Sequence, residues 1–270
     1  MKIAFLGGGN MANALIGGLL ARGFAATDLS VIEALAPARE KLVASFKVHV
    51  SASPDAATRA ADTLVLAVKP QDMKAALAPV ALLVPGKLVI SIAAGVRLGT
   101  LSRWLGGYAK LVRCMPNTPA LIGAGITGLY APAEVSPEER ARVVEVLGAV
   151  GECVWVGEER LLDPVTAVSG SGPAYVFWFI EQLARSGEAL GLAPEASRTL
   201  ALHTVLGAAK LAAGSEEAPG VLRERVTSKG GTTEAAFKVF DAEAIAERFA
   251  RALEAASRRG AELGDLLDKS

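Results

Sequence analysis

The sequence of 270 residues predicts an α/β fold followed by an all-α region. Over residues 1–160, short apolar runs alternate with amphipathic segments, which is typical of a parallel sheet with helices on both faces. A glycine-rich turn follows the first apolar run. After about residue 160 the strand-like runs disappear, and alanine, leucine, glutamate and arginine recur at helical spacing. We therefore expect two domains, residues 1–160 and residues 161–270.

Apolar runs bounded by turn-forming residues predict the strands of the first domain. We expect these strands at residues 3–6, 29–32, 64–68, 88–92, 110–114, 126–130 and 153–156, the last two completing an edge of the sheet. Helical spacing predicts helices at residues 11–22, 37–46, 54–60, 71–83 and 98–105. Another helix starts at Ser136-Pro137-Glu138-Glu139, where serine and glutamate can form a capping box.

Long helices are predicted in the second domain at residues 173–190, 194–213 and 242–267. Gly191 and Gly214 stand where helices commonly end. The stretch 173–180 is apolar nearly all round and contains Phe177, Trp178 and Phe179 in succession. A helix of this kind must be buried on every side, and a domain of about 110 residues can barely enclose it. We expect it to pack against a second subunit.

The composition excludes several classes of protein. Apolar residues make up 51% of the chain and 28 basic side chains balance 28 acidic ones, which excludes a disordered chain. The neutral balance and the 5% aromatic content argue against nucleic-acid binding. Two cysteines are too few for a disulfide scaffold and, with two histidines, argue against a metal site. Cys114 is expected to be a buried small residue rather than a nucleophile.

The uncharged stretch between Lys2 and Arg22 could be taken for a secretory signal. However, Asn10, Asn13 and five glycines interrupt it, and a strand, a turn and a helix explain it better. No segment holds the ~20 apolar residues that a membrane span requires. We expect a cytoplasmic, soluble protein.

The first predicted strand leads into Gly7-Gly8-Gly9-Asn10-Met11-Ala12, a G-x-G-x-x-A turn that opens a helix. Gly7 permits the tight turn, Gly9 lets the backbone approach a pyrophosphate, and Ala12 allows close packing of helix on strand. The amino-terminal N–H groups of the helix then face the phosphates. In this strand–turn–helix context the pattern predicts dinucleotide binding.

The identity of the dinucleotide stays open. Glu33 ends the second strand, where an acidic side chain would accept a hydrogen bond from the ribose 2′-hydroxyl of NAD. A 2′-phosphate would be repelled there unless Arg39 or Lys41 turned towards it. Glu33 could also be a solvated residue at the start of a helix.

Further polar segments are unusual for loops with a purely structural role. Lys69, in Ala67-Val68-Lys69-Pro70-Gln71, follows a strand at the sheet edge where α/β folds bind ligands. Two prolines bracket Asn117-Thr118 and stiffen that loop. The small residues of segment 169–175 precede a helix, and a capping turn with a close helix crossing would also explain them.

The segment 226–234 joins two helices through two glycines and a cluster of hydroxyl groups. Backbone N–H groups at Gly230, Gly231, Thr232 and Thr233 would point outward at a helix start and could hold a carboxylate. A bare capping loop would need one hydroxyl, not four.

Taken together, these motifs resemble the pyrroline-5-carboxylate reductase family across essentially the whole chain. The matching segments are Gly-Gly-Gly-Asn-Met-Ala (7–12), Ala-Val-Lys-Pro-Gln (67–71), Met-Pro-Asn-Thr-Pro (115–119), Ser-Gly-Ser-Gly-Pro-Ala-Tyr (169–175) and Thr-Ser-Lys-Gly-Gly-Thr-Thr (227–233). The resemblance implies a Rossmann domain and a helical dimerisation domain, in dimers that can assemble into rings. It also implies hydride transfer from NAD(P)H to the imine carbon of 1-pyrroline-5-carboxylate, giving L-proline.

Site residues follow from the motifs and the resemblance. The candidate cofactor-binding residues, for NADP(H) or NAD(H), are Gly7, Gly8, Gly9, Asn10, Met11, Ala12, Glu33, Ala67, Val68, Lys69, Pro70, Ala93, Ala94, Gly95 and Asn117. The candidate substrate-binding residues are Glu159, Ser228, Gly230, Gly231, Thr232 and Thr233. Thr233 is the candidate catalytic residue, because it matches the hydroxyl that the family places beside the ring nitrogen.

The chain departs from the family pattern at a few positions. Pro54 stands where many relatives have an asparagine that contacts the ribose, and Arg225 stands where some have an amide. Glu33 replaces a small or basic residue of several NADPH-preferring relatives. The NADH or NADPH preference, the size of the assembly, inhibition by proline, and the roles of Glu159, Arg225 and Pro54 stay open.

Reduction of a protonated cyclic imine needs mainly positioning, which can lower a barrier by roughly 7–11 kcal/mol. Neither His49 nor His203 lies in a motif, so we expect Thr233 to orient the ring nitrogen and relay a proton to it. A β-hydroxyacid dehydrogenase or another imine reductase would share the two-domain plan, with Lys210 as the nearest candidate for a catalytic lysine. A non-catalytic dinucleotide sensor is a third alternative, against which the threonine-rich loop argues.

Overall fold

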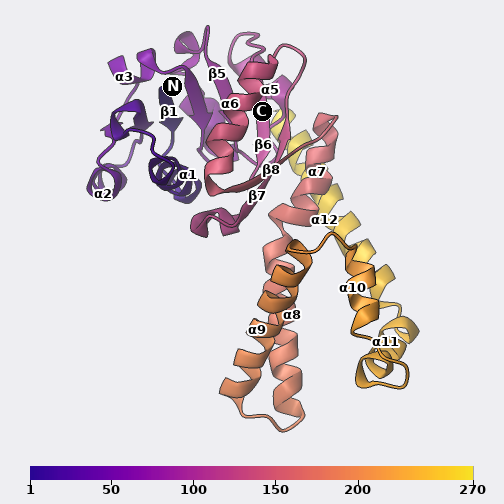
Figure 1. The fold of residues 1–270 in the computed structure, drawn as a ribbon. Helices are drawn as coiled ribbons and strands as arrows, with labels where there is room; N and C mark the ends of the chain where they lie inside the picture. Colours follow the sequence, from indigo (N-terminus) through magenta and orange to yellow (C-terminus); the bar gives the residue numbers. More distant parts are fainter. Residues whose placement is uncertain (270) are drawn as a thin grey trace. The chain divides into compact units, whose positions relative to one another are not determined.

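The computed structural model describes residues 1–269, which form two compact units. Of the described residues, the first unit contains 1–171 and 254–269, and the second contains 172–253. The first unit is the sheet with its flanking helices, and the second consists of helices (Figure 1).

The sheet has the strand order β3-β2-β1-β4-β5-β6-β7-β8 over the described residues. The strands are β1 (Ile3–Leu6), β2 (Leu29–Ile32), β3 (His49–Ser51), β4 (Thr63–Leu66), β5 (Leu88–Ser91), β6 (Leu111–Met115), β7 (Gly125–Tyr130) and β8 (Gly151–Trp155). Neighbouring strands are parallel except β6 and β7. The order 3-2-1-4-5-6 is that of a Rossmann fold, so the predicted fold class is confirmed.

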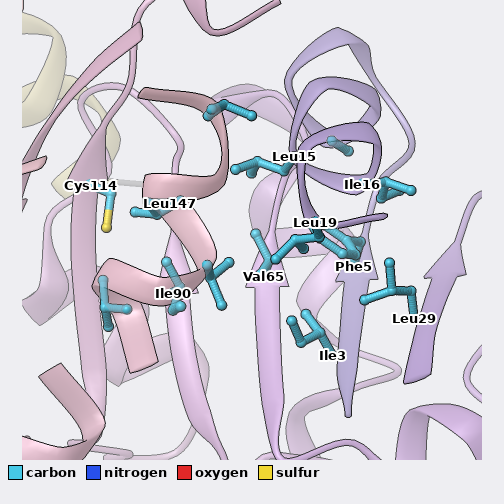
Figure 2. Packing of buried hydrophobic residues seen from close by; sticks show 14 of the residues in the cluster. Ile3, Phe5, Leu15, Ile16, Leu19, Leu29, Val65, Ile90, Cys114 and Leu147 are labelled. Atoms are coloured by element: carbon cyan, nitrogen blue, oxygen red, sulfur yellow. The ribbon is translucent and has the colours of Figure 1, made fainter. Parts of the chain in front are cut away.

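Helices cover both faces of this sheet. They are α1 (Asn10–Ala21), α2 (Ala36–Phe46), α3 (Ala56–Ala60), α4 (Met73–Leu77), α5 (Leu98–Trp104), α6 (Pro137–Leu147) and α7 (Leu162–Val165). Side chains alternate across each strand, so Ile3 and Phe5 of β1 join the core beneath α1, α2 and α6 (Figure 2). Ala4 and Leu6 join a second core beneath α4 and α5.

The predicted strands are present, with ends that differ by a few residues, and β3 is an addition. The predicted helix at residues 71–83 is wrong, because only Met73–Leu77 is α-helical and 3₁₀ turns flank it. Pro79 explains the early end, since its ring would clash with the carbonyl four residues earlier and it offers no N–H. The helix predicted at 54–60 begins at Ala56, where Asp55 and Thr58 form a capping box.

The second unit contains α8 (Gly172–Ala189), α9 (Pro194–Ala213), α10 (Pro219–Arg225) and α11 (Thr232–Ala242), followed by the first part of α12 (Ile245–Asp268). Helices α8 and α9 run side by side as a hairpin (Figure 1). Their close approach is possible because a Cβ on Gly187 would lie 2.5 Å from Ser197 Oγ. The predicted helix at 242–267 starts three residues later, because Ala244 takes a left-handed φ of 51° between α11 and α12.

These units differ from the predicted domains at two places. The first unit extends past residue 160 because α7 and the π-helical turn Thr166–Gly170 pack tightly on it. A Cβ on Gly128 of β7 would lie 2.5 Å from Val165 Cγ1, and one on Gly170 would lie 2.6 Å from Met115 Cε. The last turns of α12 also belong to the first unit. Among residues 1–269, no helix combines the length and apolar character needed to cross a membrane.

The two adjacent glycines of α1 give a test of this packing. A Cβ on Gly18 would lie 2.5 Å from the carbonyl oxygen of Ala149, whereas one on Gly17 would lie 3.4 Å from Phe46 Cε1. Gly17→Ala should raise the free energy of unfolding by about 0.5–1 kcal/mol through helix propensity. Gly18→Ala should lower it by about 1–3 kcal/mol through overpacking. Urea unfolding followed by circular dichroism measures both, and equal effects would contradict the packing described.

Candidate active site

The turn after β1 has the backbone geometry that a dinucleotide requires. Gly7 has a φ of 98°, and a Cβ on it would lie 2.9 Å from the carbonyl oxygen of Ala67, so glycine is needed for the turn itself. A Cβ on Gly9 would meet no atom of the described residues within 4 Å, chain neighbours aside. Gly9 is therefore open on the side where a pyrophosphate would lie, and the turn fits such a ligand.

The amino-terminal end of α1 is also prepared for an anion. Gly9 is its N-cap and no side chain of the described residues caps it, so its first N–H groups are available to a ligand. Asn13 Nδ2 donates to the carbonyl oxygens of Gly8 at 2.7 Å and Gly9 at 2.8 Å. Asn10 and Met11 are the first two residues of α1, and Ala12, the third, is buried. The glycine turn is thus braced from within α1.

Glu33 follows β2 and reaches back to the same turn. Its Oε2 accepts a hydrogen bond from the N–H of Gly8 at 2.9 Å, and its Oε1 accepts one from the N–H of Leu35 at 2.9 Å. Arg39 Nη1 donates to the carbonyl oxygens of Glu33 at 3.0 Å and Ala34 at 2.6 Å. A carboxylate, rather than a cation, therefore lies beside the turn where a Rossmann fold meets the ribose.

The segments after β4 and β5 lie at the same edge of the sheet. Leu6 of β1 pairs with Leu66 of β4, which pairs with Ser91 of β5, so these parallel strands end together. The residues that follow are Ala67, Val68, Lys69 and Pro70 after β4, and Ala93, Ala94 and Gly95 after β5. The structure thus brings these predicted cofactor residues to the edge that holds the glycine turn.

Asn117 has a structural task in this edge. Its side chain is buried, its Oδ1 accepts from the N–H of Ile126 at 3.0 Å, and its Nδ2 donates to the carbonyl oxygen of Ser169 at 3.2 Å. These bonds tie the loop after β6 to β7 and to the π-helical turn. Both polar atoms of the Asn117 amide are thus engaged within the first unit.

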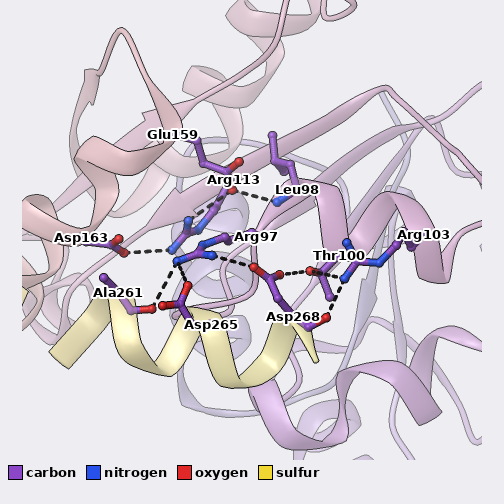
Figure 3. Close-up of polar contacts among 10 residues, drawn as sticks. All are labelled: Arg97, Leu98, Thr100, Arg103, Arg113, Glu159, Asp163, Ala261, Asp265 and Asp268. Atoms are coloured by element: carbon purple, nitrogen blue, oxygen red, sulfur yellow. Dashed lines mark hydrogen bonds and ion pairs between the residues drawn. The ribbon is translucent and has the colours of Figure 1, made fainter. Parts of the chain in front are cut away.

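Glu159 belongs to a charge cluster around the buried Arg113, which the sequence analysis did not predict (Figure 3). Arg113 of β6 is 4% exposed. Its Nη1 lies 3.2 Å from Glu159 Oε1, and its Nη2 lies 3.5 Å from Asp163 Oδ1. The same Glu159 oxygen accepts the N–H of Leu98, the first residue of α5, at 2.8 Å. An arginine inside an otherwise apolar strand run was the available signal, because a buried arginine needs a carboxylate partner.

The loop 228–233 lies in the second unit, and Gly230 has a left-handed φ of 75°. The N–H of Gly230 donates to Glu234 Oε2 at 2.7 Å, and that of Gly231 donates to the carbonyl oxygen of Ser228 at 3.0 Å. Thr232 and Thr233 are the first residues of α11, so their N–H groups have no acceptor within the helix. Of the four N–H groups predicted to bind a carboxylate, two thus donate within the loop, and two have no acceptor within α11.

The structure also shows the surroundings of Cys114, Arg225 and Lys210, three further residues considered from the sequence. Burial raises the pKa of the Cys114 thiol, which is fully inside the core and so is not a thiolate nucleophile. Arg225 pairs with Glu217 at 2.5 Å on the surface of the second unit. Lys210 is exposed on α9.

Comparison with known proteins identifies relatives along the whole chain. Residues 159–263 match a family model described as pyrroline-5-carboxylate reductase dimerisation. Residues 2–95 match a model described as NADP oxidoreductase, coenzyme F420-dependent. The chain is 48% identical over 269 residues to the pyrroline-5-carboxylate reductase of Pseudomonas aeruginosa, covering 98% of each chain.

Solved structures agree with these relatives. A pyrroline-5-carboxylate reductase from Coxiella burnetii has a TM-score of 0.92 at 38% identity, covering 97% of this chain and 98% of its own. The pyrroline carboxylate reductase of Plasmodium falciparum, solved with NADP bound, has a TM-score of 0.84 at 28% identity, covering 98% of both chains.

Substitutions at Gly7 and Gly9 should have different effects, one on stability and the other on ligand binding. Gly9 has an ordinary extended backbone, with φ of −70° and ψ of −176°, so Gly9→Ala should leave the free energy of unfolding nearly unchanged. The added methyl would meet the pyrophosphate and weaken NADH and NADPH binding roughly 5- to 150-fold. Gly7→Ala should instead destabilise the fold by about 1–3 kcal/mol. Calorimetric titration and urea unfolding test the pair, and undiminished binding by Gly9→Ala would remove the pyrophosphate from this turn.

Proposed function

The chain belongs to the pyrroline-5-carboxylate reductase family, and from that premise we propose how its own residues carry out the reaction. The enzyme reduces 1-pyrroline-5-carboxylate to L-proline with NAD(P)H as the hydride donor. The open space at Gly9 is the main support for the cofactor site, because it leaves room for a pyrophosphate in the turn where a Rossmann fold binds one.

In this proposal the first unit holds the dinucleotide. The amino-terminal N–H groups of α1 bind the pyrophosphate, and Glu33 accepts a hydrogen bond from the adenosine ribose. The segments 67–70 and 93–95 hold the nicotinamide half, because they follow β4 and β5 on the other side of the point where the strand order reverses. Bound NAD(P)H supplies the hydride that reduces the imine carbon.

The loop of the second unit holds the substrate in this proposal. The outward N–H groups of Thr232 and Thr233, at the positive end of the α11 dipole, bind the carboxylate of the pyrroline. The side chain of Ser228 contributes a further hydroxyl, and Gly230 and Gly231 give the loop its shape. The Thr233 hydroxyl orients the ring nitrogen and relays a proton to it.

Glu159 needs a different role from the substrate contact that the family resemblance implies. Its Oε1 already accepts from Leu98 and faces Arg113, which is buried. We propose that Glu159 acts mainly by holding α5 and β6 together, next to the loop 93–95.

We propose that the enzyme is a homodimer built through its second unit and acts in the cytoplasm. None of the described residues of α8 is buried in the single chain, and Phe177, Trp178 and Phe179 are 66%, 60% and 47% exposed. Apolar surface of this extent marks a protein interface. The family model that matches residues 159–263, described as a dimerisation region, supports a second copy as the partner. Assembly of dimers into a ring stays a prediction.

Thr233 is tested by removing its hydroxyl at constant shape. Thr233→Val should lower kcat/KM for 1-pyrroline-5-carboxylate roughly 5- to 150-fold, the effect of losing one hydrogen bond in the transition state. Thr233→Ser should restore most of the loss. Thr27→Val, in the 3₁₀ turn Ala26–Asp28 before β2, serves as the control. An unchanged kcat/KM in Thr233→Val would remove Thr233 from the mechanism.

The Glu33 carboxylate should favour NADH, because it would repel a 2′-phosphate and Arg39 is engaged with backbone carbonyls. We expect kcat/KM for NADH to be at least equal to that for NADPH. Glu33→Gln should shift the NADPH:NADH ratio of kcat/KM towards NADPH by roughly tenfold or more. Glu40→Gln, an exposed acid on α2, should leave the ratio unchanged. A tenfold preference of the wild-type enzyme for NADPH would contradict this role.

A further inference from the structure

We propose that the last two turns of α12 form a wall of the nicotinamide end of the cofactor pocket, held there by Arg97 and Asp268. This proposal rests on the assignment of loop 93–95 to the cofactor in the proposed function. It assigns a binding role to carboxyl-terminal residues that lie far from every motif of the sequence.

A cavity of about 390 Å³ lies at this place in the first unit. Pro70, Ala94 and Gly95 line it from the segments after β4 and β5, and Leu263, Leu266 and Leu267 line it from α12. A volume near the lower end of the usual range for ligand pockets suits one end of a dinucleotide rather than the whole molecule. The β4–β5 side of the sheet, opposite Glu33, is the side of the nicotinamide half.

Backbone contact between α12 and loop 93–95 is close enough for the helix to set the loop position. Gly95 has a left-handed φ of 77°, and a Cβ on it would lie 3.7 Å from the backbone nitrogen of Gly264 and 3.8 Å from Leu263 Cβ. A Cβ on Gly264 would lie 3.1 Å from Arg97 Nε. Gly264 is the buried residue of α12, so the helix reaches this position through a glycine.

Charged groups fix the helix end next to the loop (Figure 3). Arg97, two residues after Gly95, donates to Asp268 Oδ2 at 2.6 Å and lies 2.7 Å from Asp265 Oδ1. Thr100 of α5 donates to the second oxygen of Asp268, and Arg103 Nη2 donates to the Asp268 carbonyl oxygen at 2.9 Å. Next to Arg97, the N–H of Leu98 donates to Glu159 Oε1 at 2.8 Å. The loop is thus anchored at residues 97 and 98 by two distant parts of the chain.

The Asp268 carboxylate is ionised at neutral pH. Burial by itself would raise its pKa, but the hydrogen bonds from Thr100 and Arg97 and the charges of Arg97 and Arg103 lower it below the ordinary value of 3.8. A lowered pKa means that the interaction contributes fully above about pH 4 and is lost only as the pH falls through the lowered value. The contact therefore persists at neutral pH.

Asp268→Asn tests the proposal, because it removes the charge and keeps the shape. Dissociation constants for NADH and NADPH, measured by calorimetry on the full-length protein, should rise roughly 2- to 30-fold. The kcat at saturating cofactor and the KM for 1-pyrroline-5-carboxylate should stay within about twofold, because the loop 228–233 is untouched. Asp268→Glu should recover part of the affinity. Glu262→Gln, on the same helix but paired with Arg259 in solvent, is the matched control.

A second variant tests the wall without touching the charges. Leu266 is 58% exposed, so Leu266→Ala should leave the fold intact while weakening cofactor binding. Leu82 is 91% exposed and lies outside the cavity, so Leu82→Ala should change neither the stability nor the cofactor affinity. Wild-type affinity in both Asp268→Asn and Leu266→Ala would overturn the proposal. If the wild-type protein bound no dinucleotide, the proposed function itself would fail. That outcome differs from wild-type affinity in the two variants, which contradicts only the role of α12.

Discussion

The close approach of the Gly7 backbone to the end of β4 is the constraint on which the first unit depends. A Cβ on Gly7 would lie 2.8 Å from Val68 Cγ1 and 2.9 Å from the Ala67 carbonyl oxygen. Only a residue without a side chain lets β1 turn there and enter α1 directly. The same turn leaves Gly9 open and brings the N–H of Gly8 to Glu33. Packing therefore requires a glycine at position 7, whereas the space around Gly9 is left free for the proposed pyrophosphate.

Two arginines, Arg113 in β6 and Arg97 in the segment after β5, each connect several elements of the first unit. Arg113 is buried and gathers Glu159 and Asp163, which joins β6 to α5 and α7. Arg97 is partly exposed and gathers the carboxylates at the end of α12. A buried arginine without its partner is costly, whereas a partly exposed pair is screened by solvent and contributes less. The ion pairs of Arg113 thus stabilise the fold, whereas those of Arg97 are suited to adjusting the position of a loop.

The second unit has a different physical character from the first. Its helices leave many large apolar side chains exposed, and none of the described residues of α8 or α11 is buried in the single chain. A unit of this kind gains little stability from its own core, because apolar burial is the main favourable term in folding. In the homodimer that we propose, contact with a second copy would supply the missing burial. This unit also carries the loop 228–233, which we propose holds the substrate, so in the proposed dimer the position of the loop would follow from assembly as well as from folding.

Local chemistry was enough to predict seven of the strands, the glycine turn, the place of Glu33 after β2 and the loop between α10 and α11, because periodicity and turn residues act over a few neighbours. It missed β3, which is short and only partly buried, and the break at Pro79. Long-range packing decided the rest. Glu159 and Leu98 are 61 residues apart in the sequence, and Arg97 and Asp268 are 171 apart, so no local pattern encodes such pairs. The return of α12 to the first unit likewise depends on side chains that meet only after the sheet has formed.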